Sequence, residues 1–282
     1  MVTVCLSERY PDAELDVYGE FDAGSRPAVL IWPGGAYYFL SEEEQRPIAS
    51  FFLDHGYQAF VLRYSVGSRA AYPAPLIEGS LAVWEIRKNC KKYGVDPDKI
   101  ALVGFSAGAH AALMLATHWH EDISREGTEI PYGGNRPNAT VTGYTPTTFE
   151  DFYQQSDSTR SRASGGIGDG PSNLIGADGT VWDSLSALTV HQHVSEHTPP
   201  AFLWKTTADL PESSTRYLEA CRDHGIACEL HIFHDSKRCP ALRFDRRYAV
   251  DFDEHYKPNT RQWGVLALNW LDDVLNDEER ER

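Results

Sequence analysis

IALVGFSAGAHAALMLATHWH, residues 100–120, is the stretch that decides the fold of this 282-residue chain. Its first six residues form an apolar run typical of a buried strand, and the residues from Ala107 onward have the composition of a helix. Between them lies Gly104-Phe105-Ser106-Ala107-Gly108, a GxSxG sequence at a strand-to-helix turn. Such a tight turn exposes its serine at a helix N-terminus, where the helix dipole stabilises developing negative charge. The stretch therefore predicts a nucleophile elbow with Ser106 as the nucleophile.

Strand-like and helix-like segments alternate on both sides of this stretch. Apolar segments expected to be strands are 28–32, 58–64, 139–144, 201–206 and 228–233. Helical patterns are found in 41–55, 75–93, 212–224 and 262–275. A chain in which strands alternate with helices forms a mostly parallel sheet covered by helices on both faces. We therefore expect one α/β domain over residues 1–282, with no internal repeat.

The segment 150–198 departs from this alternation, because DFYQQSDSTRSRASGGIGDGPSN within it is polar and rich in glycine and serine. A domain boundary there would leave the sheet with too few strands. We therefore interpret the segment as a small cap inserted at the top edge of the sheet, a position where insertions often cover a site. Tyr153 and Trp182 are its candidate pocket residues.

The composition argues against several classes of partner. Lys and Arg number 26 against 41 Asp and Glu, and the net charge of −15 disfavours nucleic acids and anionic membranes. The five cysteines are scattered and include no CxxC pair, so neither a disulfide framework nor a cysteine zinc site is expected. We recognise no signal peptide and no apolar run of membrane-spanning length, which predicts a cytoplasmic protein. A homo-oligomer remains open.

A second motif, Trp32-Pro33-Gly34-Gly35-Ala36-Tyr37, follows the predicted strand 28–32. Hydrolases with a nucleophile elbow place the other donors of their oxyanion hole after this earlier strand. Small residues there let backbone N–H groups approach a substrate oxygen closely. We predict an oxyanion hole formed by the N–H groups of Gly35, Ala36 and Ala107, with Tyr37 contacting the substrate.

Together these motifs resemble the α/β-hydrolase superfamily, and within it the acetylxylan-esterase-related, feruloyl-esterase-like group of small carboxylesterases. The matching residues are PGGAYYFLSEEEQRPIASFF, GYQAFVLRYSV, YPAPL, IRKN, VDPDKIALVGFSAGAH, NLIG at 173–176, HVSEHTPPAFLWKT and CELHIF. The resemblance implies an α/β-hydrolase fold and cleavage of small acyl esters, commonly on acetylated sugars or similar alcohols. It implies no metal and no organic cofactor, and it leaves the natural substrate open.

The resemblance also points to the acid of a Ser-Asp-His triad. After the strand AFLWKT the group carries an acidic pair and a short spacer, where this sequence has Ala208-Asp209-Leu210-Pro211. Asp209 is the best match, and it has the expected place in the chain order. The competing interpretation is a helix-start residue for 212–224. Ala36 replaces the third glycine of the group, and its N–H donation survives if its φ is compatible.

The position expected for the catalytic histidine holds an arginine. The group reads ELHIF, a glycine-containing loop, and then His-Gly-Leu. Counted from His231, the histidine falls on Arg238, with Cys239-Pro240 where Gly-Leu is expected. An arginine side chain stays protonated and cannot accept the proton of Ser106.

Three interpretations of this substitution remain open. In the first interpretation, the loop after the strand 228–233 is re-routed, and His234 or, less favourably, His255 supplies the imidazole. Alternatively, Arg238 occupies the base position and binds a carboxylate or phosphate group of a ligand. In the third interpretation Arg238 is a solvated loop residue and the alignment is displaced by a few positions. We take His234 as the provisional base.

The other histidines are assigned structural roles. His231 lies within a strand pattern, and His110 lies one helical turn after the nucleophile and matches a group histidine packed behind the elbow. The pairs His118/His120 and His191/His193 are close enough in sequence for a metal. They lack an associated third ligand, and solvent-facing helix ends explain them, so we predict no metal site.

The sequence thus predicts a serine carboxylesterase that cleaves small acetyl-type esters through an acyl-enzyme. Ser106 would attack the acyl carbonyl, Asp209 would orient the base His234, and water would release the acyl group. The competing hypothesis is a hydrolase-fold protein without the standard histidine, in which Arg238 binds a small anionic ligand or supports non-hydrolytic chemistry. In both cases the expected partner is a small molecule.

Overall fold

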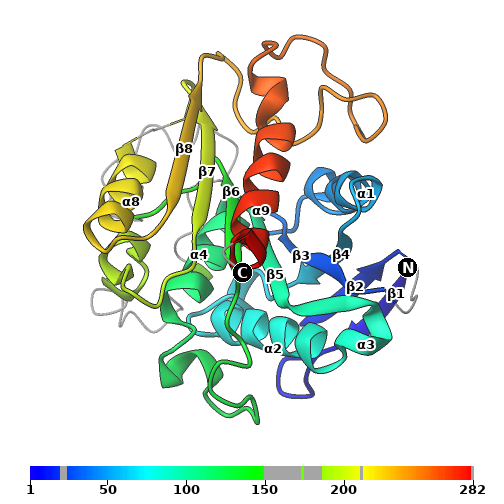
Figure 1. Ribbon diagram of the computed structural model, residues 1–282, viewed down its shortest axis with the longest axis vertical. Helices are drawn as coiled ribbons and strands as arrows, with labels where there is room; N and C mark the ends of the chain where they lie inside the picture. Colours follow the sequence, from blue (N-terminus) through cyan, green and yellow to red (C-terminus); the bar gives the residue numbers. More distant parts are fainter. Residues whose placement is uncertain (20–23, 149–172, 175–185, 210–211, 281–282) are drawn as a thin grey trace.

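The computed structural model describes residues 1–19, 24–148, 173–174, 186–209 and 212–280 of the chain. Its centre is an eight-stranded sheet with the strand order β1-β2-β4-β3-β5-β6-β7-β8 (Figure 1). The strands are β1 (Val2–Cys5), β2 (Glu14–Tyr18), β3 (Arg26–Trp32), β4 (Gln58–Arg63), β5 (Val95–Phe105), β6 (Ala139–Gly143), β7 (Ala201–Thr206) and β8 (Cys228–Phe233). Strands β3 to β8 run parallel, and β1 and β2 add an antiparallel edge.

Helices cover both faces of the sheet, as the alternating sequence pattern predicts. The α-helices are α1 (Arg46–Asp54), α2 (Ala74–Lys88), α3 (Cys90–Tyr93), α4 (Ala107–His118), α8 (Glu212–Asp223) and α9 (Trp263–Arg280). The short 3₁₀ helices are η1 (Glu42–Glu44), η2 (Gly67–Arg69), η3 (Asp122–Arg125), η5 (Val190–His193) and η6 (Thr260–Gln262). Apolar side chains of α2, α4 and α8 pack into one core layer, and those of α1 and α9 pack into the other. Figure 1 shows α9 crossing one face of the sheet.

Aromatic stacking fixes the C-terminal helix on the sheet. The rings of Trp204 on β7 and Trp263 on α9 stack with centroids 4.7 Å apart and an interplanar angle of 12°. Both side chains are almost completely buried, and large buried aromatic groups dominate the energetics of a core. Gly143 makes room for this stack, because a Cβ there would lie 2.7 Å from the Trp204 ring.

Three features of the fold differ from the sequence pattern. Strands β1 and β2 were not predicted, because β1 is short and mostly exposed and so carries no apolar run. The helical pattern 75–93 is divided between α2 and α3 at Asn89. The pattern 41–55 is divided as well, since η1 precedes an α-helix with a proline in its first turn.

The parallel strands bring four connecting loops to one edge of the sheet. Trp32 at the end of β3 is in register with Gly104 near the end of β5. Thr206 and Phe233, which end β7 and β8, are likewise in register. The loops after β3, β5, β7 and β8 therefore leave the sheet on the same side, where open α/β sheets bind their ligands.

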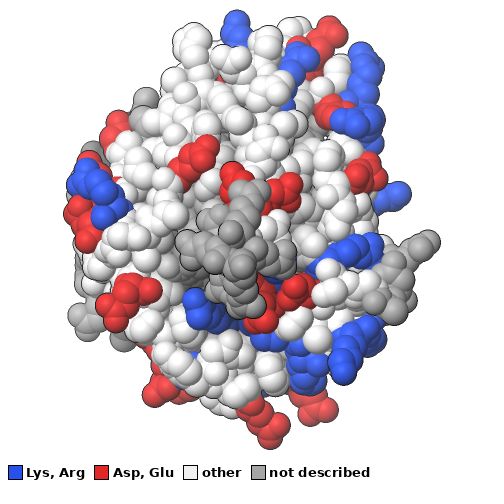
Figure 2. Space-filling view, in the orientation of Figure 1, with Lys and Arg blue, Asp and Glu red and all other residues white. Residues whose placement is uncertain are grey.

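The surface carries both signs of charge. Acidic and basic side chains are interspersed on the face shown in Figure 2, although the chain as a whole is strongly acidic. Within the part of the chain that the structure describes, no helix combines the length and the apolar character needed to cross a membrane.

Candidate active site

Ser106 occupies a strained turn between β5 and α4. Its backbone has φ 51° and ψ −119°, values that non-glycine residues rarely adopt. The flanking glycines are required by space: a Cβ on Gly104 would lie 2.5 Å from the Ala109 Cα, and one on Gly108 would lie 2.2 Å from the Trp32 carbonyl oxygen. The N–H group of Ser106 donates to the Gly143 carbonyl at 3.0 Å. The strand–turn–helix geometry of the predicted elbow is therefore present.

The loop after β3 exposes backbone donors beside this turn. Gly35, Ala36 and Tyr37 have φ values of 133°, 53° and 57°, so the chain turns sharply at these consecutive residues. Only glycine fits at the first of them, because a Cβ there would lie 2.0 Å from the Phe39 carbonyl oxygen. Among the described residues, the N–H groups of Gly35, Ala36 and Ala107 have no acceptor. These are the donors that the sequence selects for an oxyanion hole, and their role there stays a prediction.

The buried Glu44 carboxylate hydrogen bonds to the backbone of this loop. Its Oε2 accepts the Gly34 N–H at 2.6 Å, and its Oε1 accepts the Tyr144 hydroxyl at 2.5 Å. A Cβ on Gly34 would lie 2.9 Å from Glu44 Oε2 and 3.0 Å from the Ser106 Cβ, so the carboxylate lies close to the nucleophile. Burial raises the pKa of Glu44 to about 7, and the hydrogen bonds from Tyr144 and Gly34 oppose part of that effect. Sequence reasoning missed this residue because it lies in a run of glutamates that indicates a helix start.

The burial of Glu44 predicts a distinctive pH dependence of stability. Because its pKa is about 7 in the folded chain and ordinary in the unfolded chain, the unfolded chain loses this proton first as the pH rises. The stabilising contribution is complete below about pH 4.5 and is lost as the pH passes about 7, a change on the order of 3 kcal/mol. Glu44→Gln removes this titration, so its free energy of unfolding, measured with urea across this range, should vary less with pH.

The exposed neighbour Glu42 provides the matched control. Glu42→Gln should leave the pH dependence of the wild-type chain in place, because its carboxyl group is not held in the core. Parallel pH profiles for wild type and Glu44→Gln would show that Glu44 does not titrate as its burial requires.

Asp209, the predicted triad acid, is buried at the end of β7 and is fully hydrogen bonded. Its Oδ1 accepts the Nε–H of Arg238 at 2.9 Å. Its Oδ2 accepts the hydroxyl of Thr206 at 3.0 Å and the Thr206 N–H at 3.3 Å. The hydrogen bond to Asp209 raises the pKa of Arg238 above its usual value. The residue beside the acid is therefore Arg238, and both carboxylate oxygens are engaged away from α8.

His234, the predicted base, is not brought to Asp209. It is exposed, whereas its neighbours Phe233 and Asp235 are buried. His255 is also occupied elsewhere, since its Nδ1 contacts Asp253 Oδ1 at 2.9 Å. All eleven histidines of the chain lie in the described residues, and none hydrogen bonds to the side chain of Ser106 or Asp209. The predicted Asp209–His234 contact is absent, and His234 as base stays a hypothesis.

Asp235 explains why its neighbour faces outward. Its Oδ2 accepts the Lys257 N–H at 2.8 Å and the Thr260 hydroxyl at 2.9 Å, and its carbonyl accepts the Thr207 hydroxyl at 3.0 Å. These bonds draw Asp235 inward and tie the loop after β8 to η6 and to the end of β7. Because successive side chains of an extended segment point in opposite directions, His234 is directed to solvent.

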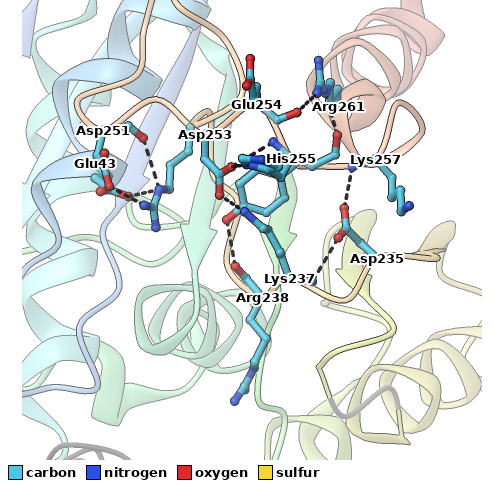
Figure 3. Close-up of polar contacts among 12 residues, drawn as sticks. Glu43, Asp235, Lys237, Arg238, Asp251, Asp253, Glu254, His255, Lys257 and Arg261 are labelled. Atoms are coloured by element: carbon cyan, nitrogen blue, oxygen red, sulfur yellow. Dashed lines mark hydrogen bonds and ion pairs between the residues drawn. The ribbon is translucent and has the colours of Figure 1, made fainter.

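The same loop directs Arg238 away from a network of charged side chains. Figure 3 shows Lys237 pointing toward Asp253 and His255, whereas the Arg238 side chain extends in the opposite direction. The Arg238 carbonyl accepts the Tyr256 hydroxyl at 3.2 Å, which holds its backbone. Its side chain is 63% exposed, and its Nη atoms have no acceptor among the described residues. The guanidinium is thus anchored through Nε and open at its outer end.

Cys239 follows Arg238, and its thiol is influenced by the two buried carboxylates Asp209 and Glu44. Its φ is 49°, a left-handed value that a cysteine rarely adopts. Burial, together with the charges of Asp209 and Glu44, raises the pKa of its thiol to about 12. Asp209 and Glu44 therefore both affect the Cys239 thiol. This shared effect links Asp209, at the end of β7, to the loop after β3 that Glu44 contacts.

Tyr37 packs its side chain into the core behind the loop. Its side chain is 0% exposed, and its hydroxyl lies 2.7 Å from His110 Nδ1. His110 Nε2 lies 2.8 Å from the Leu188 carbonyl, which can only accept, so Nδ1 is the nitrogen that accepts the tyrosine hydroxyl. Burial lowers the pKa of His110 to about 4 and keeps it neutral. Tyr37 is a buried support of the loop, and its predicted contact with the substrate stays a prediction. The buried position of His110 agrees with its structural interpretation.

The predicted cap 150–198 is only partly described. Residues 149–172 and 175–185, which include Tyr153 and Trp182, lie outside the described residues. Between them, the Asn173 side-chain amide donates to the Tyr37 carbonyl at 3.2 Å, and the Leu174 carbonyl accepts the Tyr72 N–H at 2.8 Å. Asn173, in the middle of the segment, thus contacts the loop after β3 at Tyr37. The cap itself stays a prediction.

Comparison with known proteins assigns the chain to a family. Residues 15–216 match the protein family described as BD-FAE. The chain belongs to this family. Among curated relatives, endo-1,4-beta-xylanase B of Butyrivibrio fibrisolvens is 32% identical over 225 residues, 78% of this chain and 33% of that protein. The acetylxylan esterase of Xylanibacter ruminicola is 25% identical over 73% of this chain and 39% of its own length. This chain spans about a third of the length of the curated relatives it matches.

Solved structures confirm the α/β-hydrolase fold of this BD-FAE chain. The acetyl ester-xyloside bifunctional hydrolase of Caldicellulosiruptor lactoaceticus superimposes with a TM-score of 0.77 at 26% identity, over 97% of this chain and 96% of that one. MGS-M1, an α/β-hydrolase from a Medee basin deep-sea metagenome library, gives a TM-score of 0.70 at 27% identity, over 98% and 97% of the two chains. These neighbours and the family match identify the chain as a member of an ester-hydrolase family.

Proposed function

We propose that this chain is a serine carboxylesterase that cleaves small acyl esters of the acetyl type. The observation that carries the proposal is the position of Ser106, on a strained elbow beside three backbone N–H groups that find no acceptor within the described part of the chain. Preorganised donors of this kind stabilise the oxyanion of acyl transfer. The names of the relatives, which include a xylanase, an acetylxylan esterase and an acetyl ester-xyloside hydrolase, support an acetylated carbohydrate as the substrate class.

In the proposed reaction, the Ser106 hydroxyl oxygen attacks the acyl carbonyl carbon, and the carbonyl oxygen becomes an oxyanion bound by Gly35, Ala36 and Ala107. The tetrahedral intermediate then expels the alcohol, and water later releases the acyl group from the serine. The Ser106 proton must pass to a base and then to the leaving alcohol. Arg238 contacts Asp209 at the point where the resemblance predicts an imidazole, and a guanidinium cannot accept this proton. We therefore propose that proton transfer limits the rate on simple neutral esters.

A second candidate function assigns Arg238 to ligand recognition. Asp209 holds the guanidinium through Nε and leaves both Nη atoms free of acceptors among the described residues. A planar guanidinium presents paired N–H groups that match a carboxylate or phosphate. This arrangement favours an ester or other small ligand that carries an anionic group close to Ser106.

A matched pair of substrates tests both candidates. We expect 4-nitrophenyl hemisuccinate, which carries a carboxylate, to be cleaved with a kcat/KM about 10-fold above that for 4-nitrophenyl butyrate, of similar acyl length. Arg238→Ala should remove this preference. Lys237→Ala should keep it, because Lys237 is paired with Asp253 on the other side of the loop.

Covalent labelling tests the nucleophile separately. A fluorophosphonate should modify wild type on Ser106 slowly, because the serine lacks an imidazole partner, and should leave Ser106→Ala unmodified. Failure to label Ser106, combined with no turnover of any short ester, would overturn the esterase proposal. An equal rate for both esters would overturn the role of Arg238 alone.

A further inference from the structure

A group of metal-binding side chains lies at the end of α4 opposite to Ser106. His118 ends α4, Glu121 follows it, and His193 belongs to η5. One ligand atom of each residue lies within 4.8 Å of the ligand atoms of the other two. The 12-residue helix separates this group from Ser106 by about 18 Å, so it is distinct from the candidate active site.

This arrangement overturns the sequence interpretation of these histidines. The sequence pairs His118 with His120 and assigns no third ligand, whereas the fold brings His118 to His193 and Glu121. His120 lies instead against His197, with ring centroids 4.4 Å apart. His118 is 2% exposed and so is no solvent-facing helix end.

His118 has a buried ring nitrogen with a free lone pair among the described residues. Its Nδ1 lies 3.0 Å from the Met114 carbonyl, which can only accept, so Nδ1 carries the proton. Nε2 is then unprotonated, and it is buried without a hydrogen-bond partner among the described residues. A buried acceptor without a partner is rare in native proteins, and a site for an ion or a water molecule is one of its recognised causes.

His193 and Glu121 also have a ligand atom that makes no hydrogen bond among the described residues. His193 Nε2 lies 2.9 Å from the Ser186 carbonyl, which leaves Nδ1 unprotonated. The His118 and His193 rings lie with centroids 4.4 Å apart. The Glu121 N–H donates to the His118 carbonyl at 2.9 Å, and its carboxylate has no hydrogen bond or ion pair within the described part of the chain. Each of the three converging residues therefore has a ligand atom with no hydrogen-bond partner among the described residues.

We propose that His118, Glu121 and His193 form a zinc site. Two neutral imidazoles and one carboxylate are ligands that zinc prefers, with a fourth position left for water. Metal-binding histidines usually donate their second N–H to a carbonyl or carboxylate, as both histidines do here. Ligand atoms around a tetrahedral zinc lie about 3.3 Å apart, so small side-chain rotations close the site.

The site joins two elements that position the candidate active site. Its α4 ligand belongs to the helix that starts after Ser106, and its η5 ligand lies on the chain that leads into β7 and Asp209. Zinc would cross-link these elements through residues far apart in the sequence, and so would stabilise the folded chain. The proposal does not depend on the esterase assignment.

Zinc binding to the metal-free chain tests the proposal. Titration against a chromophoric chelator should show one saturable zinc site per chain, and zinc at about 100 times its Kd should raise the Tm on the order of 5 °C. Glu121→Gln and His193→Ala should each weaken zinc binding at least about 10-fold. His197→Ala, which removes a neighbouring histidine outside the site, and the distant His224→Ala should each change the affinity by less than about twofold.

These variants also define the results that overturn the proposal. No saturable site in the wild-type chain would end it, as would an unchanged affinity in both Glu121→Gln and His193→Ala. Equal weakening by His197→Ala would indicate unspecific binding to the surrounding histidines. Because Glu121 and His193 are only partly buried, their variants are expected to fold in the absence of zinc, which circular dichroism checks. Ser106→Ala should bind zinc as wild type does.

Discussion

Replacing Arg238 with histidine is expected to raise kcat/KM for short acetyl esters on the order of 10³-fold. The Arg238 Nε lies 2.9 Å from Asp209 Oδ1, the contact that an imidazole Nδ1–H makes in a Ser-His-Asp triad. A histidine there gains an acid that orients it and stabilises its charged form, and its other nitrogen becomes available to the Ser106 hydroxyl. Steady-state turnover of 4-nitrophenyl acetate by the purified Arg238→His variant measures the gain.

Two control variants separate this effect from a general increase in histidine content. Lys237→His adds an imidazole one residue away, on the side of Asp253, and should give no gain. Arg238→His combined with Cys239→Gly relaxes the left-handed residue that follows, and should gain at least as much as the single variant.

His234→Ala tests the remaining alternative. With Arg238 beside the acid, His234→Ala should leave the turnover of wild type unchanged. Robust turnover by wild type that His234→Ala destroys and Arg238→Ala spares would instead assign the base to His234. That result would require the loop after β8 to give up the Asp235 bonds that direct His234 to solvent.

Ser106→Ala is expected to cause the second large change, a loss of kcat whose size depends on the residue at position 238. In the Arg238→His background we expect a loss on the order of 10⁴-fold or more in kcat, because nucleophile, base and acid act as a unit. In the wild-type background the loss should be much smaller, since a triad without its base has already lost most of its cooperative effect. The difference is measured by a double-mutant cycle with one acetyl ester.

The fold should tolerate this substitution, since the Ser106 hydroxyl has no hydrogen-bond partner within the described residues. An unchanged Tm is the control. Equal losses in the two backgrounds would show that Arg238→His had not built a triad. Retention of most activity in the double variant would end the assignment of Ser106 as nucleophile.

Much of the fold was readable from local sequence. The glycines at 104 and 108 surround Ser106 because a side chain at either place would collide with neighbouring backbone, and this requirement acts within a few residues. The apolar runs of β3 to β7 mark strands that are largely buried, and helical spacing between them predicts the coverage of the sheet. The chain order of these elements also predicts where the elbow at Ser106 and the loop after β3 lie.

The partners of the candidate site residues were decided by the tertiary structure. Sequence spacing gives no information on whether Asp209 meets Arg238 or His234, because Asp235 fixes the direction of that loop through residues of η6 and the end of β7. The contact of Glu44 with Tyr144 joins residues separated by 100 positions.

The convergence of His118, Glu121 and His193 has the same origin. Motif spacing detects ligands that lie on one element, whereas here α4 and η5 supply the histidines from segments far apart in the chain. Local sequence thus determined the strands, the helices and the strained turn at Ser106, since these depend on sterics and on the period of apolar residues. Which side chains meet at the carboxyl edge and at the end of α4 depends on strand register and loop packing, which only the folded chain establishes.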